Sequence, residues 1–334
     1  MISSAHGGIA ICAGRRRAVV KRVLIASHRG YCAGVERAVE TVERALEIYG
    51  PPVYVRKQIV HNTHVVCDLQ ARGAIFVESE AAVPRGGRLV LAAHGVAPEV
   101  YRTAAARGLA TIDATCPLVK KVHVEVRRFA DAGYCVILIG HAGHEEVVGT
   151  AGEAPEAVVL VETLEQAHAV DVPDPERVAY VTQTTLSIDE TAEIIAVLHE
   201  RFPALSGPRK EDICYATTNR QRAVKEMLPE IDVLLVIGSS NSSNSTRLVE
   251  TAQASEVAAY MIEDKTEIDE TWLEGRETVG LTSRASAPEK LLVGVCDWFR
   301  AHGVTEIAPF ASRSEDVSFK LPVELSREAA HAAA

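Results

Sequence analysis

Three of the seven cysteines could do chemistry, because each lies where a predicted strand ends or a predicted helix begins. These are Cys32, Cys116 and Cys214, and Cys116 stands directly before a proline suited to the first turn of a helix. The positive end of a helix dipole stabilises a thiolate, so these positions predict acidic thiols that could react or bind metal. No second cysteine lies within four residues of Cys116, which argues against a zinc knuckle and a CxxC redox pair.

Three convergent thiolates suit an iron–sulfur cluster better than a structural zinc site. Structural zinc usually takes four protein ligands, often from close cysteine pairs. A cluster of four irons and four sulfides accepts one cysteine at each iron. With three protein ligands, one iron stays open to a substrate oxygen and can act as a Lewis acid as well as an electron relay. Since no fourth cysteine has an equivalent context, the sequence predicts that open iron.

Polar side chains follow the predicted strands at matched distances from each cysteine. The first polar loop comes 29, 28 and 28 residues after the three cysteines, at His61, His144 and Ser242. The second comes 62, 68 and 72 residues after them, at His94, Thr184 and Ser286. Together with Ser243 and Asn244, these donor-rich and mostly neutral loops suit a phosphate or diphosphate. Taken singly, a histidine at a strand end can be structural, and a Ser/Asn run can be a solvated loop.

Glu146 stands two residues after His144, among groups otherwise suited to an anion. If its carboxyl group is desolvated, it could carry a proton to a leaving hydroxyl. It could equally be an acid that stabilises the start of a helix beside Glu145. Thr184 likewise either belongs to a proton relay or satisfies backbone groups at a strand end.

The elements that must position these residues repeat three times. Each cysteine begins a series of alternating helices and strands about 95 residues long, which predicts three α/β units with parallel-rich sheets. Ligands of such sheets lie at the carboxyl ends of the strands, so we expect a pseudo-threefold arrangement around one central cavity. The predicted division is an extension expected to be disordered, three repeats and a tail, at residues 1–21, 22–115, 116–212, 213–308 and 309–334.

Composition narrows the class of protein further. The 334 residues carry a formal net charge of −10 and no basic patch interleaved with aromatics, which disfavours nucleic-acid binding. No apolar run approaches the roughly 20 residues that span a bilayer. In residues 1–22 the basic cluster follows a very short apolar stretch, the reverse of a signal peptide. With an odd number of cysteines, this predicts a cytoplasmic protein without a disulfide framework.

Several motifs, in order from about Val23 to Leu325, jointly resemble the 4-hydroxy-3-methylbut-2-enyl diphosphate reductase family of the non-mevalonate isoprenoid pathway. They are RGYCAGVERAV, IVHN, AAHGV, DATCPLV, GHAGHEEVVGT, TQTTLS, DICYATTNRQ, GSSNSSNS and ASAP. The resemblance implies a trefoil of three α/β domains around a [4Fe-4S] cluster. It also implies reductive removal of the substrate's hydroxyl, which gives isopentenyl and dimethylallyl diphosphates. Electrons would come from an external donor, with ferredoxin or flavodoxin expected.

The resemblance also assigns roles to residues of this sequence. It implies cluster ligands at Cys32, Cys116 and Cys214, a proton donor at Glu146 and a substrate contact at Thr184. It implies diphosphate binding by His61, His94, His144, Ser242, Ser243, Asn244 and Ser286. One departure is Arg284, in TSRAS, where the family commonly has a glycine. Arg284 could contact phosphate, clash with the usual loop conformation or point to solvent.

Other functions remain open at this point. A quinolinate synthase-like or other [4Fe-4S] hydro-lyase would also use three cysteines, but it would bind carboxylates and favour arginine at the cavity. The function of a cluster-based redox sensor or metal-storage protein would not explain the polar loops or Glu146. A nucleophilic Cys116 with a histidine base would leave Cys32 and Cys214 unexplained.

Overall fold

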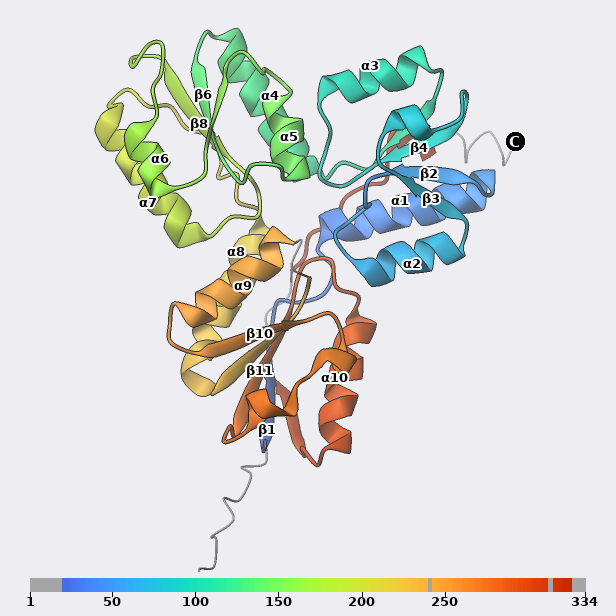
Figure 1. Ribbon diagram of the computed structural model, residues 1–334, viewed down its shortest axis with the longest axis vertical. Helices are drawn as coiled ribbons and strands as arrows, with labels where there is room; N and C mark the ends of the chain where they lie inside the picture. The colour runs from blue at the N-terminus through green and yellow to red at the C-terminus, as the bar shows by residue number, and fades with distance from the viewer. Residues whose placement is uncertain (1–19, 240–241, 312–314, 326–334) are drawn as a thin grey trace, which may run out of the picture.

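Three small α/β lobes surround a common centre in the computed structural model (Figure 1), which describes residues 20–239, 242–311 and 315–325. Each lobe is built on one sheet whose paired strands are all parallel, as predicted. Residues 1–21 were predicted to be disordered, but residues 1–19 lie outside the described residues, so this prediction is not tested.

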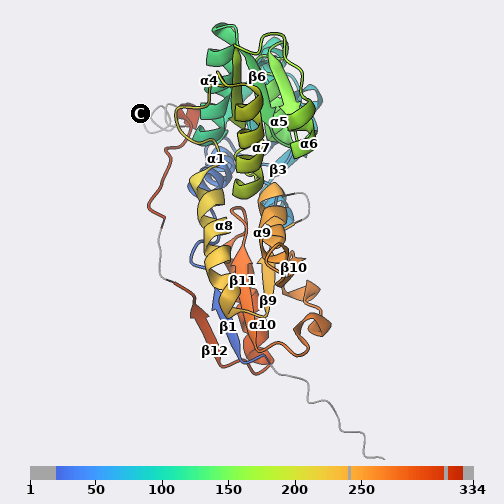
Figure 2. The same cartoon turned by 90° about the vertical axis from the view of Figure 1, so that its left-hand side faces the viewer.

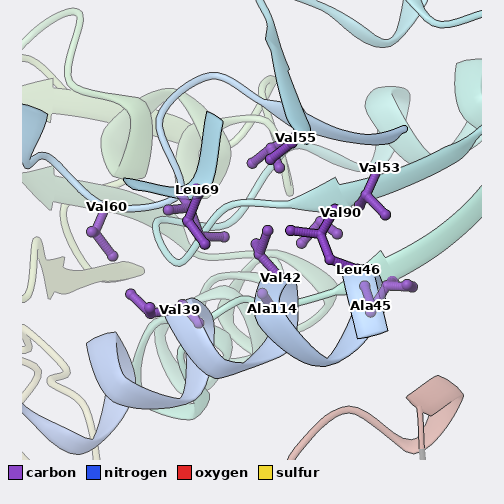
Figure 3. Close-up of a cluster of buried hydrophobic side chains, with 14 of the residues drawn as sticks. Val39, Val42, Ala45, Leu46, Val53, Val55, Val60, Leu69, Val90 and Ala114 are labelled. Atoms are coloured by element: carbon purple, nitrogen blue, oxygen red, sulfur yellow. The ribbon is translucent and has the colours of Figure 1, made fainter. Parts of the chain in front are cut away.

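The first lobe contains a four-stranded sheet in the order β3-β2-β4-β5. Its strands are β2 (Val53–Arg56), β3 (Ala74–Val77), β4 (Arg88–Leu91) and β5 (Ala110–Asp113). Its helices are α1 (Ala33–Tyr49), α2 (Thr63–Ala71) and α3 (Pro98–Ala106), with a 3-10 turn η1 (Glu80–Ala82). Val39, Val42 and Leu46 recur on one side of α1 at helical spacing and pack against Val53 and Val55 of β2 (Figure 3).

The second lobe contains a three-stranded sheet in the order β7-β6-β8. Its strands are β6 (Cys135–Ile139), β7 (Val158–Val161) and β8 (Val178–Thr182). Its helices are α4 (Pro117–Asp131), α5 (Glu145–Ala151), α6 (Leu164–Ala169) and α7 (Ile188–Arg201). Val136 and Leu138 of β6 pack with α4 and α5, whereas Ile137 and Ile139 pack with α6 and α7, so helices cover both faces.

The third lobe contains a five-stranded sheet in the order β10-β9-β11-β1-β12. Its strands are β1 (Arg22–Ile25), β9 (Val233–Ile237), β10 (Ala258–Ile262), β11 (Thr278–Ser283) and β12 (Glu306–Pro309). Its helices are α8 (Tyr215–Met227), α9 (Ser243–Gln253) and α10 (Glu289–Ala301), with the 3-10 turns η2 (Leu228–Glu230), η3 (Lys265–Glu267) and η4 (Glu270–Leu273). Alternate side chains of β9 pack against α10 on one face and against α8 and α9 on the other.

Strand β1 does not lie in the unit to which its position in the sequence assigns it. Residues 22–115 were predicted to form the first repeat, but β1 pairs with β11 and β12 of the third lobe. The other repeats show the same arrangement. The strand before Cys116 is β5, which pairs with β4 of the first lobe. Before Cys214, Ser206 forms a bridge to Ala179 of β8 in the second lobe. The strand before each cysteine therefore completes the preceding lobe, and for Cys32 that lobe is the third.

The end of the chain returns from the third lobe to the first (Figure 2). We call residues 310–311 and 315–325 the C-terminal strap. At its start the amide of Phe310 donates to the carbonyl of Ile25, and further along the Nε of Arg37 donates to the carbonyl of Lys320 at 2.7 Å. At its end Leu325 is buried in the apolar core of the first lobe. None of the helices in the described ranges has the length and apolar character that crossing a membrane would require.

Candidate active site

A single cavity at the centre of the three lobes is lined by all twelve predicted site residues. Its space between atoms, open mouth included, is about 730 Å³, within the usual range for ligand sites. The first lobe supplies Cys32, His61 and His94 to the lining. The second supplies Cys116, His144, Glu146 and Thr184, and the third supplies Cys214, Ser242, Ser243, Asn244 and Ser286.

The three cysteines occupy equivalent backbone positions. Each is the residue that caps the start of a long helix: Cys32 for α1, Cys116 for α4 and Cys214 for α8. The three cysteine amides donate to carbonyls that each lie two residues beyond the end of a strand, namely Ala285 after β11, Ala93 after β4 and Thr184 after β8. The N–H···O distances are 3.1, 3.0 and 3.0 Å. The pseudo-threefold relation therefore extends to individual hydrogen bonds.

The sulfur atoms of these cysteines lie near one another. A Cβ placed on Gly34 would come within 2.6 Å of the Cys116 Sγ and 3.9 Å of the Cys32 Sγ, so only glycine fits at this point of α1. The Cys214 sulfur accepts from the amide of Thr217 at 3.4 Å and lies 3.2 Å from the Thr217 hydroxyl. All three sulfurs thus belong to one small region of the cavity wall.

For Cys116 and Cys214, the prediction of acidic thiols is wrong in the protein without a bound group. Burial raises the pKa of Cys116 to about 12, with the proximity of Cys32 as the next contribution. Burial also raises the pKa of Cys214 to about 11. Hydrogen bonds from backbone amides lower both values but do not outweigh desolvation. A cation is therefore needed before these thiols can lose their protons together.

The donor set fits an iron–sulfur cluster better than a single metal ion. Within the described part of the chain, no three His, Cys, Asp or Glu side chains are placed to hold one metal ion. Three buried sulfurs from three different helix starts, facing one cavity, instead match a group that joins its cysteines through several irons. The close approach of Gly34 to two of these sulfurs leaves no side chain in the space between them.

The three histidines form a compact neutral group. The rings of His61 and His94 stack with centroids 4.1 Å apart, and His144 meets them edge-on at 5.5 and 5.9 Å. Burial lowers the pKa of His61 to about 4 and that of His144 to about 4, and it lowers the pKa of His94 well below its ordinary value. The Nδ1 of His144 accepts from the amide of Glu146 at 3.1 Å, so its neutral ring carries the proton on Nε2 and can donate from there.

Of the remaining predicted anion-binding residues, Ser286 lies where the third lobe meets the first, and Ser243 lies where the third meets the second, since its hydroxyl donates to the carbonyl of Thr185 at 2.8 Å. The side chain of Asn62 donates to the carbonyl of Ser286 at 2.7 Å, and the Ser286 hydroxyl donates to the carbonyl of His61 at 3.2 Å. Ser242, Ser243 and Asn244 lie at the start of α9, whose first amides point toward the cavity end of the helix. The predicted loop also includes residues 240–241, which lie outside the described residues.

The Glu146 side chain is buried, and its hydrogen bonds to the described residues are both with Thr184. The amide of Thr184 donates to its Oε1 at 2.6 Å, and the Thr184 hydroxyl donates to its Oε2 at 3.0 Å. Burial raises the pKa of Glu146 to about 7, although these two hydrogen bonds oppose the shift. Of the two interpretations left open by the sequence, this geometry favours a carboxyl group that can hold a proton at neutral pH.

A second layer of contacts ties the Cys32 loop to the helix of Cys214. The Tyr215 hydroxyl accepts from the amide of Ala33 at 3.1 Å, and the Nη2 of Arg220 donates to the carbonyl of Gly30 at 2.9 Å. Arg220 is completely buried and also faces Glu315 of the C-terminal strap at 3.4 Å. The sequence analysis did not find Gly34, Thr217 or Arg220. Thr217 could have been found from its spacing, one helical turn after Cys214.

Arg284 lies behind the cavity wall and does not line it. Its neighbours Ala285 and Ser286 do line the cavity, while its own side chain is only 3 % exposed. Its backbone is not among the positive-φ positions, so the loop accepts a side chain here without strain. The strained loop and the side chain in solvent are therefore wrong, and Arg284 is also absent from the cavity lining, where it would have to lie for direct contact with phosphate.

Comparisons with known proteins agree with this geometry. The family model described as LytB protein matches residues 23–304. The 4-hydroxy-3-methylbut-2-enyl diphosphate reductase of Acidothermus cellulolyticus is 59 % identical over 309 residues, which are 92 % of this chain and 91 % of the relative. The reductase of the same name from Nocardia farcinica is 56 % identical over 306 residues, 91 % of each chain.

Solved structures give the same result. The E-1-hydroxy-2-methyl-but-2-enyl-4-diphosphate reductase of Plasmodium falciparum matches with a TM-score of 0.90 and 36 % identity, over 94 % of this chain and 100 % of that one. A structure described as (E)-4-hydroxy-3-methyl-but-2-enyl diphosphate reductase, the terminal enzyme of the non-mevalonate pathway, matches with a TM-score of 0.60 and 33 % identity, over 84 % and 100 %. The trefoil prediction is thereby confirmed. The chain belongs to the LytB family of 4-hydroxy-3-methylbut-2-enyl diphosphate reductases.

Proposed function

We propose that this protein reduces 4-hydroxy-3-methylbut-2-enyl diphosphate to isopentenyl and dimethylallyl diphosphates, with a [4Fe-4S] cluster held by Cys32, Cys116 and Cys214. The observation that carries the proposal is the meeting of three equivalent cysteines, a neutral histidine group and one carboxyl with a raised pKa in a single cavity. When bound, the cluster would supply single electrons and a Lewis-acidic iron that has no protein ligand.

The cavity residues would hold the substrate by its diphosphate. His61, His94 and His144 present neutral ring donors, and the start of α9 presents backbone amides. Ser286 and Asn244 stand beside them, each fixed by a hydrogen bond to another part of the wall: Ser286 to the His61 carbonyl and Asn244 to the Ala285 amide. Binding of the diphosphate at this end would leave the allylic alcohol directed toward the cysteine region, away from bulk water.

Glu146 and Thr184 would supply the proton that the departing hydroxyl needs. The reaction consumes two electrons and two protons: one proton leaves with the hydroxyl as water, and the other adds to carbon. When Glu146 is protonated on Oε2, that proton can be donated to the Thr184 oxygen, which frees the Thr184 hydroxyl proton to point into the cavity. Addition of the second proton at either end of the allyl group would give the two products.

The electrons would come from a one-electron donor of the ferredoxin or flavodoxin class, since neither the sequence nor the cavity supplies a flavin motif. We place the reaction in the cytoplasm, because Cys32, Cys116 and Cys214 are free thiols and must stay reduced to hold a cluster. The hydro-lyase alternative is not favoured, because the cavity lining includes no arginine for a carboxylate substrate.

The test is an anaerobic assay of the reconstituted protein. Reduced methyl viologen is the electron donor, and its oxidation is followed with and without the allylic diphosphate. We expect oxidation that depends on the substrate, and formation of both five-carbon products. A fully loaded cluster without turnover would contradict the proposed activity, and a cluster that loads normally in Cys116→Ser would contradict the proposed ligation.

A further inference from the structure

The cavity presents an electrostatic problem for the proposed substrate. A diphosphate carries at least two negative charges at neutral pH, yet no lysine or arginine is among the described side chains that line the cavity. Its histidines are neutral, because burial lowers their pKa values well below 7. Bound diphosphate therefore lacks a permanent positive charge in direct contact with it.

Arg284 is a permanent cation directly behind the histidine and serine wall. It follows the end of β11, and its amide donates to the carbonyl of Ile237 at 3.0 Å, which fixes the peptide. The next two residues, Ala285 and Ser286, face the cavity. Its side chain enters a small enclosed space between the first and third lobes, beside Asn62, Thr63 and Gly238.

The guanidinium group is buried without an adequate partner. Its Nε and Nη1 atoms have no hydrogen-bond partner among the described residues. Glu263 lines the same small space and its charge raises the pKa of Arg284, but in the described ranges the structure records no direct ion pair between the two side chains. Burial of an unpaired cation is unfavourable, so an arginine in this state is expected where a counter-charge arrives later.

Two observations connect this cation to the anion-binding wall. Asn62 lines the same small space and donates to the carbonyl of Ser286, the predicted diphosphate residue. The charge of Arg284 also contributes to the low pKa of His61, after burial and His144. The guanidinium field therefore reaches the ring that faces the cavity. Burial lowers the pKa of Arg284 only to about 10, so the group stays charged at neutral pH.

We propose that Arg284 is an affinity-determining residue of this chain, which attracts the substrate's diphosphate through the His61–Ser286 wall without touching it. The inference rests on the proposed function, since it takes the diphosphate as the ligand of that wall. Arg284 acts through His61 and Ser286 and is thus a positioning residue.

The test compares Arg284→Met, which removes the charge and keeps the length, with Arg284→Lys, which keeps the charge. Inorganic diphosphate is titrated calorimetrically into the anaerobic, cluster-loaded protein at low and high salt. At low salt we expect the Kd of Arg284→Met to rise about tenfold, and that of Arg284→Lys to stay within about threefold of wild type. With the allylic diphosphate, KM should rise in Arg284→Met while kcat stays within about twofold.

Lys290→Met is the matched control, because it removes one positive charge at the same boundary between lobes. Lys290 is exposed and paired with Asp68, so its loss should leave diphosphate binding unchanged. Thermal unfolding separates binding from folding: Arg284→Met should be at least as stable as wild type, since it removes a buried unpaired charge.

Equal diphosphate affinity of wild type and Arg284→Met at both salt concentrations would overturn the inference and leave the proposed function standing. A wild-type protein that binds no diphosphate and does not turn over the allylic diphosphate would overturn both. Loss of binding in Arg284→Met together with a lowered unfolding temperature and a lost cluster spectrum would assign Arg284 a purely structural role, which also contradicts the inference.

Discussion

Glu146 shows how strongly a fold can set the chemistry of one residue. It follows the cap of a short helix, where an exposed acid would be ionised and favourable. Here its side chain is only 2 % exposed, and burial raises its pKa to about 7. The sequence left the role of Glu146 open, because its position at a helix start favours the ionised carboxylate whereas burial favours the protonated form. Burial depends on residues far away in the chain, so it could not be predicted locally.

We predict that Glu146→Gln lowers kcat by about 100-fold or more, the range expected for loss of a general acid. Glu146 with its raised pKa is protonated below about pH 7, so wild-type kcat should fall as pH rises through 7. The variant should be slow at all pH values and lack this decrease. The measurement is the pH profile of kcat between pH 5.5 and 9, with the cluster absorption as the control for a loaded protein.

The same carboxyl links pH to stability. Since the native pKa of Glu146 is raised above its unfolded value, its contribution is most favourable below about pH 4.5 and is lost as pH rises through about 7. In the protein without its cluster, the unfolding temperature of Glu146→Gln should therefore increase relative to that of wild type as the pH rises through this range. A constant difference between the two proteins from pH 4.5 to 7.5 would contradict the assigned pKa.

At the scale of elements, the starts of three helices carry the proposed cluster ligands. The sequence could predict these positions, because each cysteine precedes a run of apolar residues at helical spacing. It could not predict the state of the thiols. Two backbone amides at Cys116 and one at Cys214 lower the pKa values, but burial outweighs them, and burial depends on how the lobes close over the thiols.

Gly34 in the first turn of α1 is required by a neighbouring element, not by the helix. Alanine normally stabilises a helix relative to glycine by about 0.5–1 kcal/mol. At Gly34 its Cβ would lie 2.6 Å from the Cys116 Sγ, so Gly34→Ala must displace that sulfur. We expect the iron content per chain after reconstitution to fall by about half or more. Iron and sulfide analysis with the visible absorption of the cluster measures this.

Gly294→Ala in α10 is the control for helix propensity. Its Cβ would meet only the Lys265 side chain, at 3.8 Å, so the variant should load iron normally and unfold at the same or a higher temperature. Normal loading of both variants would show that the Cys116 sulfur is free to move, against the geometry described above.

At the scale of the whole molecule, β1 and the C-terminal strap both connect the third lobe to the first. Three α/β units around one cavity could be predicted from the matched offsets, and the structural comparisons confirm the trefoil. The placement of β1 could not be predicted from the sequence, since a four-residue apolar strand fits any parallel sheet and its partners lie over 250 residues away. The predicted boundaries at residues 116 and 213 stay predictions.

Leu325 tests the contribution of the C-terminal strap. It is only 2 % exposed and packs in the core of the first lobe, although it follows the third in sequence. We expect Leu325→Ala to reduce the free energy of unfolding by about 2–4 kcal/mol. Val323 is 61 % exposed on the same segment, so Val323→Ala should change it by less than about 0.5 kcal/mol. Denaturant unfolding measures both, and equal values would show that the strap does not stabilise the first lobe.

The pairing of β1 also determines the order in which the lobes can fold during synthesis of the protein. Arg22–Ile25 leaves the ribosome first, whereas its partners end at Ser283 and Pro309. At translation rates of roughly 5–20 residues per second, the strand waits on the order of tens of seconds with both edges unpaired. The first two lobes can form from local segments during that time. The third lobe, and with it the closed wall around the cavity, can be completed only after β12 has been made.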